Sequence, residues 1–557
     1  MMKKIVNTTL GLILVGSSVF AQSLADAKKA IDAEQYQKSK TILKGLTKSQ
    51  PSNAENFFYL GNVYLKTDYA DSAKMAYTNG IGADNEFPLN HVGLGAIELS
   101  KGAEPKSHFD KALSLTGRKD HKTLLFIGKA YVEAPKPNGA AAVTALEKAK
   151  SINAKDAEVY LALADAYRAQ QKNSEAFSNY RTAFDMDKNL LRAKVELGVL
   201  NKLSKAYPES VAEFNSVIAL NPNYGPAYRE LAETYWRWGN AEPKTYDERI
   251  NQALKFYEKY MDLTDRSLES RERHATFLVL TKKWKELEAE ANAMAQLDKT
   301  NPRIFRYLGY SAYENGNYPA SVQALKDFIA KVDTSRIIPQ DYLYLGRAQM
   351  KIAGSEAEGI KNLTKAVELD STNVEVMSEI GKALYSARKF SEAAKVFDMA
   401  VNNPTSKTKA YDNFYLGMAH YFDYAAQVKD KAQAPDTTLL TKADSAFSYV
   451  IQVAPSNPDA YLFRARVKNL SDKQDPKLGL MVPDYEKYLE VALAKPNATD
   501  EPRIKNTVIE AYKNLGAFYQ ASDVAKAKDY FNKVIELEPS DAYAQSALKI
   551  LSGSKNK

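Results

Sequence analysis

The stretch AEVYLALADAYRAQQKNSEAFSNYRTAF, from Ala157 to Phe184, contains a regular alternation of small residues and tyrosines. Its first half places apolar residues at i, i+3, i+4 and i+7, which is the pattern of one buried helix face. Its second half returns to a helical spacing after the polar turn QQKNSE. The spacing predicts two helices, 157–170 and 173–186, packed as a hairpin in which each tyrosine fills the space beside a small residue.

The same pattern recurs at intervals of about 34 residues over most of the chain. It is visible in AENFFYLGNVYLKTDYADSAKMAYTNGIGADN (54–85), VEVMSEIGKALYSARKFSEAAKVFDMAV (374–401) and NLGAFYQASDVAKAKDYFNKVIELEP (514–539). Prolines such as Pro222 and Pro539 close repeats, because proline cannot continue a helix but is accepted in the first turn of the next one. The chain is therefore expected to be one long array of helical hairpins.

This pattern resembles the tetratricopeptide repeat family, and the resemblance covers nearly the whole chain. It implies an all-α, right-handed superhelical solenoid of about thirteen hairpins. The solenoid is expected to span residues 22–539, with a capping helix and tail at 540–557. Ser540 or Asp541 is the expected N-cap of that last helix.

Four segments lengthen the repeat by insertion: 131–139, 237–249, 424–441 and 472–483. Each falls between the two helices of one hairpin, so all four should project from the same edge of the solenoid. They could be docking loops for a partner, or loop growth that costs little in closure entropy. Both interpretations stay open from the sequence.

The N-terminus has the pattern of an export signal. MMKK is a positive segment, IVNTTLGLILVG is a short apolar core, and SVFAQ provides small residues before a cut after Ala21. The apolar run is shorter than the roughly 20 residues needed to span a bilayer. The sequence predicts a cleaved signal peptide at 1–21 and a mature protein in the periplasm, without a membrane span.

Composition excludes several classes of function. The chain has no cysteine, so disulfides, thiolate nucleophiles and a lipid-modified N-terminal cysteine are excluded. A formal charge of +8 over 557 residues is a weak excess, whereas nucleic-acid binding needs concentrated basic patches. No nucleic-acid partner is expected.

Residues that could perform catalysis or hold a cofactor are not arranged in any recognisable pattern. None of the five histidines is spaced for a helical metal pair, and His91 is expected to fill a core position. GSEAEGIK (354–361) lacks the Lys-Ser/Thr pair of a phosphate loop. We predict no catalytic residues, no metal site, no cofactor and no enzyme activity.

The remaining candidate site is a concave surface lined by the first helix of each hairpin, since solenoids commonly bind proteins or peptides there. Positions that the repeat register turns inward combine cations with aromatic rings, which suits carboxylate binding and stacking. The predicted partner-binding residues are Arg229, Trp236, Arg303, Arg306, Tyr310, Tyr313, Arg347, Lys382 and Tyr385. The family's clamp for C-terminal carboxylates is not expected, because Asn62 matches one of its positions but Phe58 stands where a lysine is needed.

These observations favour a periplasmic scaffold or adaptor that joins proteins of a cell-envelope complex, in outer-membrane assembly, secretion or energy transduction. A soluble ligand- or glycan-binding protein is the alternative, and it would need a compact aromatic pocket. An enzyme built on helical hairpins is the third hypothesis, and it would need a non-repeat catalytic domain, which the sequence does not contain.

Overall fold

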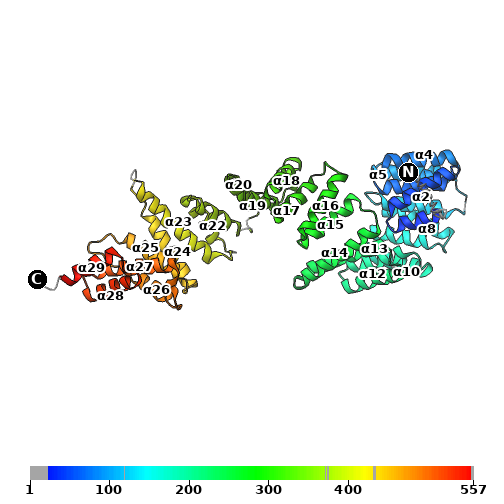
Figure 1. The fold of residues 1–557 in the computed structure, drawn as a ribbon. Coiled ribbons are helices and arrows are strands. Elements are labelled where there is room, and N and C mark those ends of the chain that lie inside the picture. The colour runs from blue at the N-terminus through cyan, green and yellow to red at the C-terminus, as the bar shows by residue number, and fades with distance from the viewer. Residues whose placement is uncertain are drawn as a thin grey trace, which may run out of the picture. The chain divides into compact units, whose positions relative to one another are not determined.

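The computed structural model describes residues 23–117, 119–370, 372, 375–404, 406–430 and 434–553. Within these residues the regular structure is helical throughout: twenty-nine α-helices and three short 3₁₀ helices, with no strand (Figure 1). The all-α fold predicted from the sequence is confirmed. The predicted signal peptide, 1–21, lies outside the described residues.

The helices divide into two compact units with a boundary between Lys299 and Thr300. Those of unit 1 are α1 (Leu24–Asp32), α2 (Tyr36–Ser49), α3 (Ala54–Lys66), α4 (Ala70–Ala83), α5 (Leu89–Ser100), α6 (Lys106–Ser114), α7 (His121–Glu133), α8 (Gly139–Ile152), α9 (Ala157–Ala169), α10 (Asn173–Met186), α11 (Leu191–Leu203), α12 (Tyr207–Leu220), α13 (Gly225–Ala241), η1 (Pro243–Thr245), α14 (Tyr246–Leu263), α15 (Leu268–Leu280) and α16 (Trp284–Leu297).

Those of unit 2 are α17 (Pro302–Glu314), α18 (Tyr318–Lys331), η2 (Thr334–Arg336), α19 (Pro339–Met350), α20 (Glu356–Leu369), α21 (Glu375–Ser386), α22 (Phe390–Asn402), α23 (Lys409–Lys429), α24 (Thr438–Val453), α25 (Pro458–Ser471), α26 (Val482–Ala492), η3 (Ala498–Asp500), α27 (Pro502–Tyr519), α28 (Val524–Leu537) and α29 (Ala542–Gly553). In the described residues α1–α28 pair as fourteen consecutive hairpins, against the predicted number of about thirteen.

The hairpin quoted first forms as its sequence predicts. Helix α9 begins after Asp156, whose carboxylate accepts the backbone N–H of Glu158 at 3.0 Å. The turn to α10 is made by Gln171 in the left-handed region, with φ of 60°. A residue in the left-handed region also ends the first helix of several other hairpins. These turns are therefore short, and the two helices that they connect must pack closely.

Close packing depends on a glycine in the first helix facing an aromatic ring in the second. A Cβ added at Gly61 would lie 2.3 Å from the ring of Tyr77, and one added at Gly381 would lie 2.8 Å from the ring of Phe397. Both rings are fully buried. The alternation of small and aromatic residues is therefore a packing arrangement, as the sequence predicted, and it leaves the exposed positions of the first helices available for other contacts.

The four inserted segments all connect the first and second helix of a hairpin, and two of them are less loop-like than the sequence indicates. Segment 237–249 is almost entirely helical, because α13 continues to Ala241 and α14 begins at Tyr246. Segment 424–441 is partly taken up by α23, which extends to Lys429. In α23 the added residues AAQVK (425–429) include good helix formers, whereas α13 continues through Gly239 and Asn240 despite their low helix propensity.

The last helix, α29, packs against α28 through Ala544, Ala547 and Leu551. Asp541 accepts the backbone N–H of Ala544 at 2.9 Å, so it caps the helix, as one of the two residues named in the sequence prediction. The opposite side exposes Tyr543 and Ile550. No helix among the described residues has the length and apolarity required to cross a bilayer.

Candidate functional site

The first helices of unit 2 hold two of the predicted arginines in ion pairs with the next repeat. Arg306 of α17 donates from Nε and Nη2 to the carboxylate of Asp341 in α19, at 2.8 and 2.7 Å. Arg347 of α19 donates in the same way to Glu379 of α21, at 2.9 and 2.6 Å. These bonds raise the pKa of Arg347. Both guanidinium groups therefore already hold a carboxylate of this chain.

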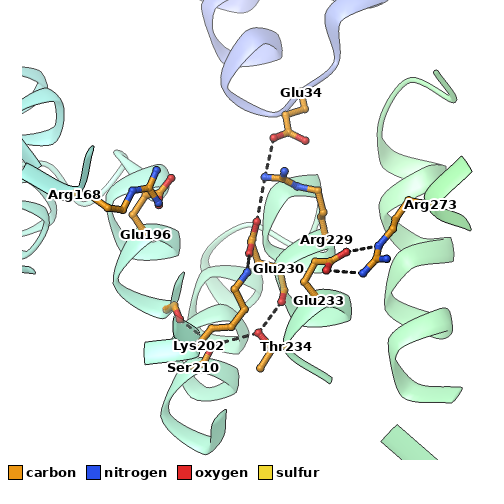
Figure 2. Close-up of polar contacts among 11 residues, drawn as sticks. Glu34, Arg168, Glu196, Lys202, Ser210, Arg229, Glu230, Glu233, Thr234 and Arg273 are labelled. Carbon is orange, nitrogen blue, oxygen red and sulfur yellow. Dashed lines mark hydrogen bonds and ion pairs between the residues drawn. The ribbon is translucent and has the colours of Figure 1, made fainter. Parts of the chain in front are cut away.

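Arg229 is held in a similar way within unit 1. Its Nη2 lies 3.1 Å from a carboxylate oxygen of Glu34, in the turn between α1 and α2, and 3.3 Å from one of Glu230 (Figure 2). Glu230 is buried and also pairs with the buried Lys202 of α11. Because Lys202 and Glu230 are buried, removing either one would leave the other as an uncompensated buried charge.

Ion pairs of this kind connect the first helices of neighbouring hairpins in both units. Their members lie 28 to 44 residues apart, roughly one repeat. We call this set the inter-repeat ladder. It comprises Lys129–Glu158, Arg168–Glu196, Lys202–Glu230 and Arg273–Glu233 in unit 1, and Arg306–Asp341, Arg347–Glu379 and Arg466–Glu510 in unit 2.

Lys382 occupies the same repeat position as Arg347, since each directly follows the glycine of its helix, Gly381 or Gly346. No carboxylate of the described residues lies within ion-pair distance of its ammonium group, and the side chain is exposed. The residue of α23 that corresponds to Glu379 is Tyr415, two positions before Gly417. The ladder is therefore interrupted between α21 and α23, and its cation there has no acidic partner.

Aromatic rings take the place of the missing carboxylate. The ring of Tyr411 lies 6.0 Å from the ammonium nitrogen of Lys382 and 4.6 Å from the ring of Tyr415. Tyr385 contacts Tyr415 and Phe422, at centroid distances of 5.4 and 6.1 Å. Burial raises the pKa of both Tyr385 and Tyr411 to about 12, so both hydroxyls stay protonated at neutral pH. We call Tyr385, Tyr411, Tyr415 and Phe422 the aromatic platform.

The other predicted aromatic residues contact the protein itself. Tyr310 donates its hydroxyl to Asp341 at 2.7 Å, and burial raises its pKa. Tyr313 packs edge-on against Tyr344 at 5.2 Å. The guanidinium of Arg273 lies 4.5 Å from the ring of Trp236. These rings are partly or fully used in packing, which reduces what they offer to a partner.

Arg303 is exposed in the first turn of α17, where its backbone N–H donates to the Asn301 side chain at 3.0 Å. The nine predicted residues thus fall on first helices, Arg229 and Trp236 in unit 1 and the other seven in unit 2. The sequence reasoning missed their acidic partners and the platform residues on α23. The carboxylates could have been found by stepping about one repeat along the chain from each cation.

His91 does not fill a core position. It is half-buried and stacks on His108 with ring centroids 6.4 Å apart, because α6 is short and leaves the ring partly uncovered. Burial, and then the proximity of His108, lowers the pKa of His91. Within the described ranges no group of three His, Asp or Glu side chains has a geometry that could hold a metal ion.

Asn62, the one match to the family's carboxylate clamp, accepts the hydroxyl of Tyr77 at 2.7 Å and so takes part in packing. Unit 2 also contains an open cleft of about 370 Å³. It is lined by Glu486, Leu489, Glu490, Leu493, Tyr512, Tyr530 and Lys533. The carboxylate of Glu486 in this cleft already accepts bonds from Lys526 and Tyr530.

No family model matches the chain. Solved structures to which it is similar include the C-terminal part of a TPR repeat-containing protein from Cytophaga hutchinsonii, at 25% identity over 50% of this chain and 99% of that one, with a TM-score of 0.38. PilF of Pseudomonas aeruginosa is 17% identical over 42% of this chain and 97% of its own, with a TM-score of 0.33.

The Cut9–Hcn1 hetero-tetramer of the APC/C contains a chain that is 16% identical over 88% of this chain and 97% of its own, with a TM-score of 0.29. The Cytophaga protein is a tetratricopeptide (TPR) repeat-containing protein. Within the described residues, the helices pair as hairpins with the small-to-aromatic packing described above, which is the all-helical repeat arrangement expected from the resemblance to tetratricopeptide repeats.

Proposed function

We propose that this chain is a protein-interaction scaffold, and that unit 2 binds a segment of a partner protein at Lys382 and the aromatic platform. The observation that supports the proposal is the interruption of the inter-repeat ladder. Three of the other predicted cations (Arg229, Arg306 and Arg347) already hold a carboxylate of this chain, whereas the ammonium group of Lys382 has none among the residues that the structure describes. A carboxylate from another protein would complete the ladder at this position.

The chemistry of the surface indicates the kind of segment that it fits. Lys382 offers three N–H donors to a carboxylate, and the platform offers ring faces to an apolar or aromatic side chain. Tyr411 is 40% exposed, while the rings behind it are half-buried and held in place by one another. A short extended segment with an acidic residue next to an apolar one suits this arrangement.

We propose further that the protein acts in the cell envelope, after export and cleavage behind Ala21. The support is the sequence pattern of residues 1–21. A soluble ligand- or glycan-binding function is less favoured, because the one cleft described above is open and its carboxylate is already bonded. Arg306 and Arg347, which the sequence suggested as ligands for a partner, are less suitable for a binding test, because their substitution breaks ion pairs within unit 2.

The test is a comparison of two charge reversals in the full-length chain. Lys382→Glu places a repulsive charge on the proposed surface, and Lys395→Glu makes the same change at an exposed position of α22. Partners are captured from crosslinked cells that express each variant. We expect specific partners to be lost with Lys382→Glu and retained with Lys395→Glu, at equal helicity by circular dichroism. Equal capture by both variants would show that the surface is not the binding site.

A further inference from the structure

The turn between α1 and α2 contacts helices that lie more than 190 residues later in the chain, all within unit 1. Tyr260 of α14 donates its hydroxyl to the Glu34 carboxylate at 3.0 Å. The Gln35 side-chain amide donates to the carbonyl of Leu263 at 3.0 Å, and the Gln37 backbone N–H donates to Asp265 at 2.7 Å. Together with the Arg229 ion pair, these bonds attach the first hairpin to α13, α14 and the segment after α14.

The backbones approach closely where this turn meets α13. A Cβ added at Gly225 would lie 2.5 Å from Thr264 and 3.5 Å from the carbonyl oxygen of Ala33. Ala33 itself packs against the cluster that contains Tyr224 and Ala227. The first distance leaves no room for a Cβ beside Thr264, and the second is an ordinary van der Waals contact between the turn and the start of α13.

The contact of the turn with α13 and α14 combines these polar bonds with the apolar packing of Ala33, and the first hairpin also has a core of its own. Ile42, Leu43 and Leu46 of α2 pack with Leu60 and Val63 of the next hairpin. Tyr36, at the end of the turn, also packs against this cluster, but no residue of α13 or α14 belongs to it. The turn can therefore leave α13 and α14 while the first hairpin stays folded on α3.

We propose that Arg229, Tyr260 and the Leu263 carbonyl form a binding site for an acidic turn, which in this chain is filled by residues 33–37. Figure 2 shows the Glu34 carboxylate reaching Arg229 from the turn above it. An acidic segment of a partner protein would take this site when the first hairpin moves away. This inference is independent of Lys382, which belongs to unit 2.

The covalent link gives the chain's own turn an advantage. An intramolecular occupant is present at an effective concentration of the order of millimolar or above. A partner segment that makes only the same few contacts would not displace the chain's own turn. The site therefore selects partners that make additional contacts, or partners that meet the protein when the turn is released. The site is thus kept closed to weak acidic ligands.

The test uses full-length protein and a fluorescent peptide with the sequence of residues 30–38, AIDAEQYQK, as the probe. The double variant Glu34→Gln, Gln35→Ala weakens or removes three contacts of the turn, those with Arg229, Tyr260 and the Leu263 carbonyl. We expect hydrogen exchange over residues 24–49 to become roughly ten-fold faster, the effect of losing one charge-assisted hydrogen bond. We expect the peptide to bind the double variant at least ten-fold more tightly than it binds the unmodified protein.

Two further variants make the result decisive. Adding Arg229→Gln to the double variant should abolish peptide binding, because the carboxylate then has no cation. Asp110→Asn, which removes the ion pair with Lys106 on α6 elsewhere in unit 1, should leave both the exchange of residues 24–49 and peptide binding unchanged. Equal binding of the peptide to the unmodified protein and the double variant, no binding to either, or binding that survives loss of Arg229 would each overturn the proposal.

Discussion

Arg306 donates two hydrogen bonds to Asp341, and the carboxylate that receives them is completely shielded from solvent. Asp341 also accepts the hydroxyl of Tyr310 at 2.7 Å and the backbone N–H of Ile338 at 2.9 Å. The ion pair Arg347–Glu379 has the same two-pronged geometry one repeat later, but its side chains are 32% and 44% exposed. The two pairs therefore differ in burial rather than in geometry, and this difference can be measured.

The first prediction compares the loss of each arginine. Arg306→Gln leaves a buried carboxylate without its cation and should lower the free energy of unfolding by about 3 kcal/mol. Arg347→Gln breaks a solvated pair and should cost about 1 kcal/mol or less. Urea unfolding followed by circular dichroism measures both. Equal costs for the two variants would mean that burial does not decide the strength of these pairs.

The second prediction concerns glycines. Gly61→Ala forces a methyl group into the ring of Tyr77 and should lower the free energy of unfolding by roughly 1–3 kcal/mol through overpacking. Gly45→Ala, in the interior of α2 with no atom within 4 Å of the new Cβ, should raise it by about 0.5–1 kcal/mol. Thermal melts should move in opposite directions. A stabilising Gly61→Ala would contradict the close packing of α3 on α4.

The third prediction concerns pH and Asp32, at the end of α1. Burial raises the pKa of Asp32 to about 6, although the nearby Tyr224 hydroxyl and Arg192 lower it and Glu158 raises it further. The folded protein thus holds this proton more tightly than the unfolded chain. The contribution of protonated Asp32 to the free energy of unfolding is fully present at pH 4 and below, and it is lost as the pH rises through 6.

Asp32→Asn removes this titration. The unmodified protein should gain more stability than Asp32→Asn when the pH is lowered from 7.5 to 5, as measured by the urea midpoint. Asp71→Asn, at an exposed position of α4, should behave like the unmodified protein. If the urea midpoint changes by the same amount between pH 7.5 and pH 5 in Asp32→Asn and in the unmodified protein, Asp32 does not titrate in the folded protein as described.

The fourth prediction addresses the aromatic platform. Tyr411→Ala removes an exposed ring that lies over Tyr415, so the variant should stay folded. It should weaken the binding of a partner captured through Lys382 by about 1–2 kcal/mol, the usual range for an aromatic interface residue. Isothermal titration with the captured partner measures this loss. Unchanged affinity would restrict the proposed contact to the lysine.

The fifth prediction concerns the mature N-terminus. Cleavage behind Ala21 should produce a chain that begins at Gln22, because Val19 and Ala21 are the small residues at the cleavage site. Mass spectrometry of protein purified from its native host identifies this terminus directly. A chain that still begins with Met1 or Met2 would exclude the proposed export.

Local features of the fold were predictable from the sequence because they repeat. Each hairpin contains the residues that predict its packing. Gly381 and Phe397, for example, lie sixteen residues apart in the sequence, and the structure confirms that they face each other between α21 and α22. The N-cap at Asp541 is equally local. Helix α13, in contrast, extends beyond the predicted turn to Ala241 although Gly239 and Asn240 have low helix propensity, so local propensity does not predict where it ends.

The candidate site was only partly predictable. Periodicity identified Arg306, Arg347 and Lys382 as residues of first helices, but it did not reveal which of them are neutralised. That depends on whether the next repeat has a carboxylate, as at Glu379, or an aromatic residue, as at Tyr415. The contact of Glu34 with Arg229 has no sequence signal at all, since its two members are not related by the repeat.

The attachment of Gln35 and Gln37 to residues 228 positions later also has a consequence for the order of folding. On a ribosome that adds roughly 5–20 residues per second, the first hairpin emerges about 10–45 s before the segment that receives its turn. During that interval α1 and α2 can pack on α3, while Glu34 remains exposed to the solvent. The first structure to form in this chain is therefore among the last to be completed.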